Sequence, residues 1–252
     1  MTPLWSLLLG YENNYYDYQD SGPGSYSALL DRDEHLFRVD PRYTVSPNTT
    51  AFLGYQFGYV DYLSNEFISQ GGMIRGTDRD NYSHYAYLGA EHKFSSKLSM
   101  EGRVGAQFIT YNKLNDHTVS PYLDVTGTYN YLQGSYLKLG VKYAHNATDV
   151  GGSTAKNVTL DQETATLYAS LNHRITALLS AGILLQYQHS TYNGGQLDGD
   201  ADDYLSAALT VGYKLSRHWS LEGSYYFDRL SSSVDGRDFT RNRVLAGVRG
   251  TY

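Results

Sequence analysis

The sequence contains no cysteine, and this absence excludes disulfide bonds and thiol chemistry. It also has no run of about eighteen or more apolar residues, so a membrane-spanning helix is excluded. A basic excess is missing too, and the net charge of −6 argues against a nucleic-acid partner. The mean hydropathy of −0.47 resembles that of a soluble protein. A transmembrane β-barrel would have the same average, because only every second residue of its strands meets lipid.

Tyrosine is unusually frequent, with 26 copies in 252 positions, and glycine has 25. Tyrosine favours membrane interfaces, because its ring prefers an apolar environment and its hydroxyl prefers water. A soluble, tyrosine-rich β-sandwich is the alternative that composition leaves open. The length suits one large domain, and we expect residues 1–252 to form it.

The segment Asp238–Tyr252 alternates between two kinds of side chain. Every second residue is small, apolar or aromatic: Val244, Ala246, Val248, Gly250 and Tyr252. The residues between them include Arg243 and Arg249. This pattern predicts a strand with one apolar and one cationic face that ends on an aromatic residue. Such a last strand resembles that of bacterial outer-membrane β-barrels.

Short and long connections alternate along the sequence. The short turns lie at 46–48, 95–97, 132–134, 173–176 and 216–218. The longer, polar connections lie at 19–34, 64–78, 112–117, 148–156, 192–201 and 230–237. Five short turns and six long connections predict a closed, antiparallel, up-and-down transmembrane barrel of about twelve strands. An even strand number places both termini on the short-turn side, which is periplasmic in such barrels.

The predicted strands have a period of two, which separates an apolar face from a polar one. It is clearest in Leu98–Tyr111, Asp203–Leu215 and Trp219–Asp228. The segment Leu36–Val45 alternates too, but Pro41 cannot donate to a ladder, so we expect a local irregularity there. Aromatic girdles are expected at both interfaces. The periplasmic girdle comprises Trp5, Tyr43, Phe94, Tyr131, Tyr213, Trp219 and Tyr252, and the outer one Tyr15, Tyr59, Phe108, Tyr143 and Tyr187.

The polar faces predict an inner wall of mixed charge, which requires a hydrated lumen. The cations expected on it are Arg38, Arg42, Lys93, Arg103, Lys138, Lys142, Arg174, Lys214, Arg241, Arg243 and Arg249. The expected carboxylates are Glu12, Asp40, Glu91, Glu101, Asp124, Glu222 and Asp228. Six tyrosines are expected to face inward, at positions 16, 87, 122, 168, 204 and 226. They could provide a stacking surface for sugars or simply fill space in the lumen. Opposite charges on adjacent strands could also pair and close the lumen.

This wall predicts a narrow, mildly basic pore for passive passage of small hydrophilic, anionic or sugar-like solutes across the outer membrane. The alternative is a non-enzymatic barrel component of a surface-polysaccharide export or assembly system. Outer-membrane lipid and lipopolysaccharide are expected partners, with a secretion system as a further candidate, and no cofactor is expected. If the first and last strands pair, Arg38, Arg42, Arg241, Arg243 and Arg249 should form one cationic sector of the wall.

Two segments of the sequence are candidates for a catalytic site and for a metal site. His189, Thr191 and Asn193 share one strand face, as in some outer-membrane hydrolases, but threonine replaces serine. We expect polar residues at the membrane rim here, and no enzyme. The acidic segment Asp198–Asp203 lacks the glycine and the distal glutamate of a calcium loop, so we expect a solvated loop and no metal.

Several segments resemble the outer-membrane β-barrel (porin-like) family of Gram-negative bacteria. They are Gly10–Asn14, Asn81–Tyr85, Leu88–Ser95, Ser120–Tyr122, Thr159–Thr164, Asn172–Thr176 and Phe239–Val244. The resemblance covers most of the chain. It implies a barrel in the outer membrane, and it implies no catalytic residues.

Overall fold

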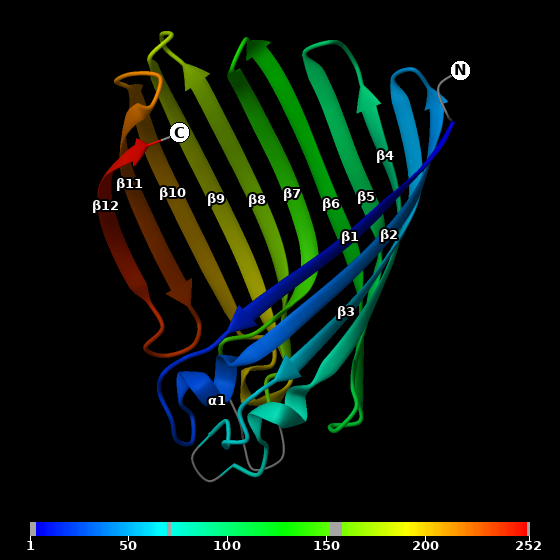
Figure 1. Cartoon of the computed structure of the whole chain (residues 1–252). Helices are drawn as coiled ribbons and strands as arrows, with labels where there is room; N and C mark the ends of the chain where they lie inside the picture. The colour runs from blue at the N-terminus through cyan, green and yellow to red at the C-terminus, as the bar shows by residue number, and fades with distance from the viewer. Residues whose placement is uncertain (1–3, 70–71, 152–157, 251–252) are drawn as a thin grey trace.

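The computed structural model describes residues 4–69, 72–151 and 158–250, which form one antiparallel sheet of twelve strands (Figure 1). Each strand pairs with its neighbours in the sequence, without a crossover. The predicted all-β, up-and-down arrangement is therefore confirmed. The strands are β1 (Trp5–Tyr16), β2 (Arg32–Ser46), β3 (Thr49–Tyr62), β4 (Asn81–Lys93), β5 (Leu98–Tyr111), β6 (Asp116–Leu132), β7 (Ser135–Ala147), β8 (Asp161–Arg174), β9 (Leu179–Asn193), β10 (Ala201–Lys214), β11 (Trp219–Ser232) and β12 (Phe239–Gly250).

The connections alternate in length as the sequence predicts, with one exception: the connection between β5 and β6, expected to be long, has only the four residues 112–115. Two-to-four-residue turns join β2 to β3, β4 to β5, β6 to β7, β8 to β9 and β10 to β11, all at one end of the sheet (Figure 1). The longer connections lie at the other end and contain α1 (Tyr26–Leu30), η1 (Gly76–Arg79) and η2 (Gly195–Leu197). Among the described residues, no helix is both long and apolar enough to cross a membrane. Since the strand number is even, β1 begins and β12 ends at the short-turn end.

The strong curvature of the sheet gives it an inward and an outward face (Figure 1). The outward face exposes large apolar residues on almost every strand, such as Leu9, Leu88, Leu167 and Leu221, whereas the inward Asp40 is fully buried. A continuous exposed apolar band of this kind is the surface that a barrel presents to lipid.

Aromatic residues flank this band at both ends. At the short-turn end the ring of Trp5 packs on that of Tyr43, with centroids 4.9 Å apart, and Phe94 and Trp219 are exposed. Tyr252, expected in the same girdle, lies outside the described residues.

The expected closure of the barrel is not present. The sheet order runs from β1 to β12 and no backbone pairing joins these two strands among the described residues. All twelve residues of β12 are exposed. Closure requires the first and last strands to meet with matching tilt and register. In the described sheet β1 pairs with β2 alone and β12 pairs with β11 alone.

Proline residues mark two interruptions of the ladders. As predicted, the β2–β3 ladder is irregular at Pro41, since Val39 and Arg42 have partners on β3 but the two residues between them do not. The β6–β7 ladder ends at Leu123 and Tyr143, two residues from Pro121. Beyond that point β6 pairs only with β5, and β7 follows β8 alone.

A side chain replaces the missing strand partner of β7. The Gln107 amide on β5 accepts a hydrogen bond from the His145 backbone N–H at 3.0 Å. It also donates to the His145 carbonyl at 3.4 Å and to the Tyr85 hydroxyl at 2.7 Å. Because these backbone groups are buried, Gln107 satisfies polar atoms that would otherwise lose their hydrogen bonds.

The long connections form a cap over their end of the sheet. Ile68, Ile74, Val158 and Leu160 from the connections pack with Ile109 and Tyr111 of β5 and with the half-buried Leu29 of α1. The α1 helix is capped by the Ser25 side chain, which accepts from the Ala28 backbone N–H at 3.0 Å. The Glu66 carboxylate accepts from the Gly22 N–H at 2.6 Å and so joins two connections.

We predict that Gln107→Leu lowers the free energy of unfolding by about 1–3 kcal/mol for each backbone group left unsatisfied, because both are buried. Urea unfolding of the detergent-solubilised chain measures the change. Gln186→Leu is the matched control, because Gln186 is a half-buried inward amide with no hydrogen bond to the described residues. Equal stability of the two variants would contradict the role given to Gln107.

Candidate functional site: the inward wall of the sheet

The first group of inward charges lies on β2–β4 around a fully buried carboxylate. The Arg38 guanidinium forks onto Asp40, with its Nε at 2.9 Å. The Tyr87 hydroxyl donates to the other oxygen of Asp40 at 2.6 Å, and Gln56 donates to Tyr87 at 3.1 Å. The Asp40 carboxylate is thus neutralised and hydrogen-bonded on both oxygens, which makes its burial tolerable.

A second group continues along β2, β4, β5 and β6. Arg42 lies 3.9 Å from Glu91 and 3.8 Å from Glu101. Arg103 pairs with Glu101 and, at 3.4 Å, with Asp124. These charges alternate in sign, so the field of each is largely cancelled by its neighbours.

The third group occupies the opposite edge of the sheet. The buried Asp228 on β11 pairs with Arg241 at 3.0 Å and Arg243 at 2.8 Å, both on β12. It also accepts from Tyr204 at 2.9 Å. Further along the same strands Arg249 pairs with Glu222 at 3.1 Å.

The five arginines expected in one sector therefore lie in two places. Arg38 and Arg42 belong to β2, and Arg241, Arg243 and Arg249 belong to β12. The single sector depended on pairing between β1 and β12, which the described sheet lacks. The expected partner Glu12 on β1 forms no ion pair with the described residues and accepts a hydrogen bond from Asn14 at 3.0 Å.

Between the two arginine groups, β7 carries two inward lysines. Neither Lys138 nor Lys142 pairs with any carboxylate of the described residues, and Lys138 lies 6.0 Å from the ring centroid of Tyr168. Lys138 faces Thr128 and Ser170 on the neighbouring strands, whereas Lys142 faces Thr166 and the Asp124 carboxylate. The Tyr168 hydroxyl lies 2.7 Å from that of Thr126.

Three aromatic rings lie flat against this wall because each faces a glycine on the paired strand. Tyr87 faces Gly54, Phe52 faces Gly89 and Tyr168 faces Gly140 in the strand registers. A Cβ added at these glycines would come within 1.9–2.2 Å of the ring. The rings therefore occupy space that any side chain would fill, and they do not project across the lumen. The Tyr87 and Tyr204 hydroxyls are bonded to carboxylates, an arrangement closer to filler than to a sugar-stacking surface.

A polar cavity of about 410 Å³ lies on the inward side next to the cap. Its lining includes Ile109 and Tyr111 of the cap cluster together with charged residues from several strands. The charged residues that line it are Glu12, Arg32, Glu34, Lys142 and Asp161.

His145 joins this cavity because the bend of β7 turns it inward. Its side chain is fully buried between Asp161, at 3.3 Å, and Glu163, at 2.7 Å. Tyr111 donates to Asp161 at 2.9 Å and connects the group to the cap. Strand alternation alone would place His145 on the outward face. The sequence signal for its inward position is Pro121, close to where β6 stops pairing with β7.

Two cations in the long connections are held by carboxylates. Burial lowers the pKa of Arg237, but Asp149 and Asp202, each 3.0 Å away, raise it, and the net pKa lies above the ordinary value. A hydrogen bond to Asp80 raises the pKa of the exposed Lys113. Both groups are therefore positive at neutral pH, and both tie connections together.

The residues considered for a catalytic site and for a metal site form hydrogen bonds with residues outside those candidate sites. His189 lies on the outward face, where its Nδ1 is 2.9 Å from Asp203, and Asp203 also accepts from Tyr187. Asn193 donates to Asp161 and not to Thr191. The carboxylates of Asp198–Asp203 bind separate donors, and no cluster suited to a metal ion occurs among the described residues.

Comparison with known proteins agrees with this geometry. A family model described as putative beta-barrel porin 2 matches residues 5–252, and the chain belongs to that family. The solved copper transporter OprC is similar to 83% of this chain, with 13% identity and a TM-score of 0.57, and the chain spans 38% of its length. The beta domain of the Bordetella autotransporter Brka matches 98% of both chains at 10% identity and a TM-score of 0.32. No curated protein matches the sequence.

We predict that Gly140→Ala displaces the Tyr168 ring into the lumen and destabilises the sheet by about 1–3 kcal/mol, as overpacking does. Single-channel conductance should fall with the narrower lumen. The control is Gly127→Ala on β6, where an added Cβ meets no atom within 4 Å. Unchanged conductance and stability in Gly140→Ala would show that the ring does not define the wall.

Proposed function

We propose that this member of the putative beta-barrel porin 2 family forms a narrow outer-membrane pore for small anionic solutes. The observation that carries the proposal is the pairing of the inward charges. The described arginines at 38, 42, 103, 241, 243 and 249 all have carboxylate partners. Lys138 and Lys142 on β7 have none among the described residues, and neither do Lys93, Arg174 and Lys214, the last residues of β4, β8 and β10.

Electrostatics favours the two lysines as the source of selectivity. A paired arginine and carboxylate form a dipole whose field decays quickly, whereas an unpaired ammonium group attracts anions over about 8 Å at physiological salt. Rings of uncompensated charge set the sign of selectivity in pores. Lys142 also lines the polar cavity, together with Arg32, Glu12, Glu34 and Asp161, so an anion that enters the cavity meets charges of both signs there.

The tyrosines favour small anions over sugars as cargo. A pore selective for sugars needs a row of exposed aromatic faces along the lumen on which the sugar rings can stack. Tyr87 and Tyr168 instead lie flat over glycines. Sugar-like solutes would then pass without a stacking surface, and we expect little discrimination among them.

We predict that the wild type prefers anions and that Lys138→Gln/Lys142→Gln abolishes most of this preference. The measurement is the reversal potential of the full chain in a planar bilayer under a salt gradient. Glu222→Gln/Arg249→Gln is the matched control, because it removes two inward charges without changing their sum. Cation preference in the wild type, or equal effects of the two double variants, would contradict the proposal.

The cap supports a second candidate, a barrel that does not conduct alone but takes part in surface-polysaccharide export or assembly. The apolar cluster around Ile68 and Ile74 joins the connections to β5 and covers the long-connection end. A partner that displaces the cap would then control access to the lumen.

We expect Ile68→Ser/Ile74→Ser to raise conductance, because buried hydroxyls weaken the cluster. Met73→Ser is the control, since Met73 is exposed beside the same cluster. Silence of the wild type and of both variants would favour the export role over the pore.

A further inference from the structure

Three of the five hairpins at the short-turn end repeat one local sequence pattern. The first strand ends with histidine or tyrosine followed by a cation, a turn of four residues follows, and the second residue of the next strand is serine. The turns are 94–97, 175–178 and 215–218. Two of them close with the same backbone hydrogen bond, since Ile175 donates to Leu179 at 3.0 Å and Leu215 donates to Trp219 at 2.9 Å. The pattern therefore places the same two side chains at the same point of each hairpin.

Strand register makes each of these cations face a serine on the inward side of the sheet. The three cation–serine pairs are Lys93–Ser99, Arg174–Ser180 and Lys214–Ser220. Each cation is exposed, and none forms an ion pair with a carboxylate of the described residues. The three serine hydroxyls form no hydrogen bond with the described residues either. Each pair therefore offers a positive charge and a hydroxyl donor that no neighbouring group uses.

Negative charge is absent from the short-turn end of the sheet. None of the five short turns, and none of the strand residues directly beside them, is aspartate or glutamate. Two inward carboxylates lie two residues away from a pair. They are Glu91, which Arg42 approaches at 3.9 Å, and Glu222, which Arg249 holds at 3.1 Å. An anion bound at the pairs would therefore meet positive charge that the protein itself does not neutralise.

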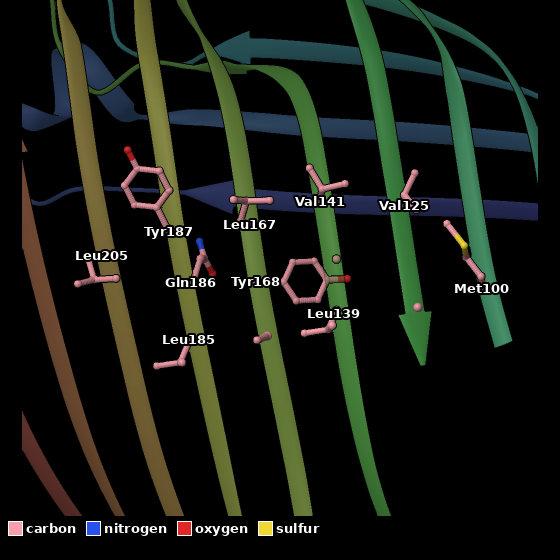
Figure 2. Close-up of a pocket in the computed structure, with 13 residues that line it drawn as sticks. Met100, Val125, Leu139, Val141, Leu167, Tyr168, Leu185, Gln186, Tyr187 and Leu205 are labelled. Atoms are coloured by element: carbon pink, nitrogen blue, oxygen red, sulfur yellow. The ribbon is translucent and has the colours of Figure 1, made fainter. Parts of the chain in front are cut away.

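The outward face of the sheet offers an anion nothing comparable. An apolar hollow of about 580 Å³ lies over β5–β10, lined by side chains such as Met100, Leu139 and Leu205 (Figure 2). None of its lining residues is charged. An anion placed there would lose its hydration without gaining a compensating charge. Anions are therefore expected at the inward pairs.

We propose that the three cation–serine pairs form a binding site for oligoanions, molecules that carry several phosphate or carboxylate groups in a row. The arginine fork and the lysine ammonium group suit the oxygens of both groups, and a serine hydroxyl donates to them as well. Neighbouring strands lie about 4.8 Å apart, so the pairs that begin on β8 and β10 are about 10 Å apart along the sheet, and the pair on β4 lies about 20 Å from β8. A single anionic group reaches one pair, whereas a row of them reaches two and gains from both.

The test is isothermal titration of the full chain in detergent at low ionic strength. The probes are tripolyphosphate and tetraglutamate, and orthophosphate is the single-group reference. We expect at least one probe to bind tenfold or more tightly than orthophosphate, and the tighter probe identifies phosphate or carboxylate as the preferred group. If neither probe exceeds orthophosphate, the site does not join several anionic groups and the proposal is wrong.

Arg174→Gln/Lys214→Gln should weaken oligoanion binding about tenfold or more, because each change removes a charge-assisted contact. Lys97→Gln/Arg217→Gln is the matched control, since it removes two exposed cations from turns of the same hairpins and changes the net charge equally. Equal losses in the two double variants would overturn the site in favour of general attraction by positive charge.

Ser180→Ala/Ser220→Ala tests the hydroxyls without any change in charge. We expect a two- to tenfold loss of affinity, roughly the effect of one or two hydrogen bonds, and unchanged affinity would overturn the pairing of cation and hydroxyl. Binding in detergent does not require conduction. A wild type that is silent in the bilayer but binds the oligoanion would therefore refute the proposed pore and leave this site standing.

Discussion

Pairing of backbone N–H and C=O groups between neighbouring strands is the constraint on which the rest of the structure depends. It fixes the period of two, which sends apolar side chains outward and charged ones inward. Where pairing fails, another group must take its place, and Gln107 does this for the end of β7. The same bend moves His145 from an outward position into the wall. The long edges of β1 and β12 remain the places where this constraint is unmet among the described residues.

Charge on the inward wall follows from the same registers. Carboxylates and arginines that face each other across two or three strands pair, and they leave little net field. Asp228 holds two arginines, and Glu101 lies between Arg42 and Arg103. The number of cations on the wall is therefore a poor guide to its potential. What matters is which of them have no carboxylate partner among the described residues: Lys138 and Lys142 on β7, and Lys93, Arg174 and Lys214 at the short-turn ends of β4, β8 and β10.

Much of the fold could be predicted from sequence, because alternation and connection length are local properties. Twelve strands, the short-turn positions and the irregularity at Pro41 all follow from them. The inward position of the paired charges follows from the same alternation. Whether the sheet closes into a barrel could not be predicted, since closure depends on the coiling of all twelve strands together. The prediction that five arginines form one sector was wrong for the same reason, because it required β1 and β12 to pair. The inward position of His145 does not follow from strand alternation, which places this residue on the outward face. It follows from the loss of β6–β7 pairing near Pro121, which the sequence pattern does not show.

Glycine has opposite consequences on the two faces, and this difference links the lumen to the lipid side. On the inward face Gly54 and Gly140 admit a ring from the next strand, so a small residue and a large one together make a smooth wall. On the outward face no ring folds over Gly127, because its cross-strand neighbours Met100 and Leu139 extend away from the sheet. The same residue type thus keeps rings flat against the inward wall and leaves a hollow between larger side chains on the outward face.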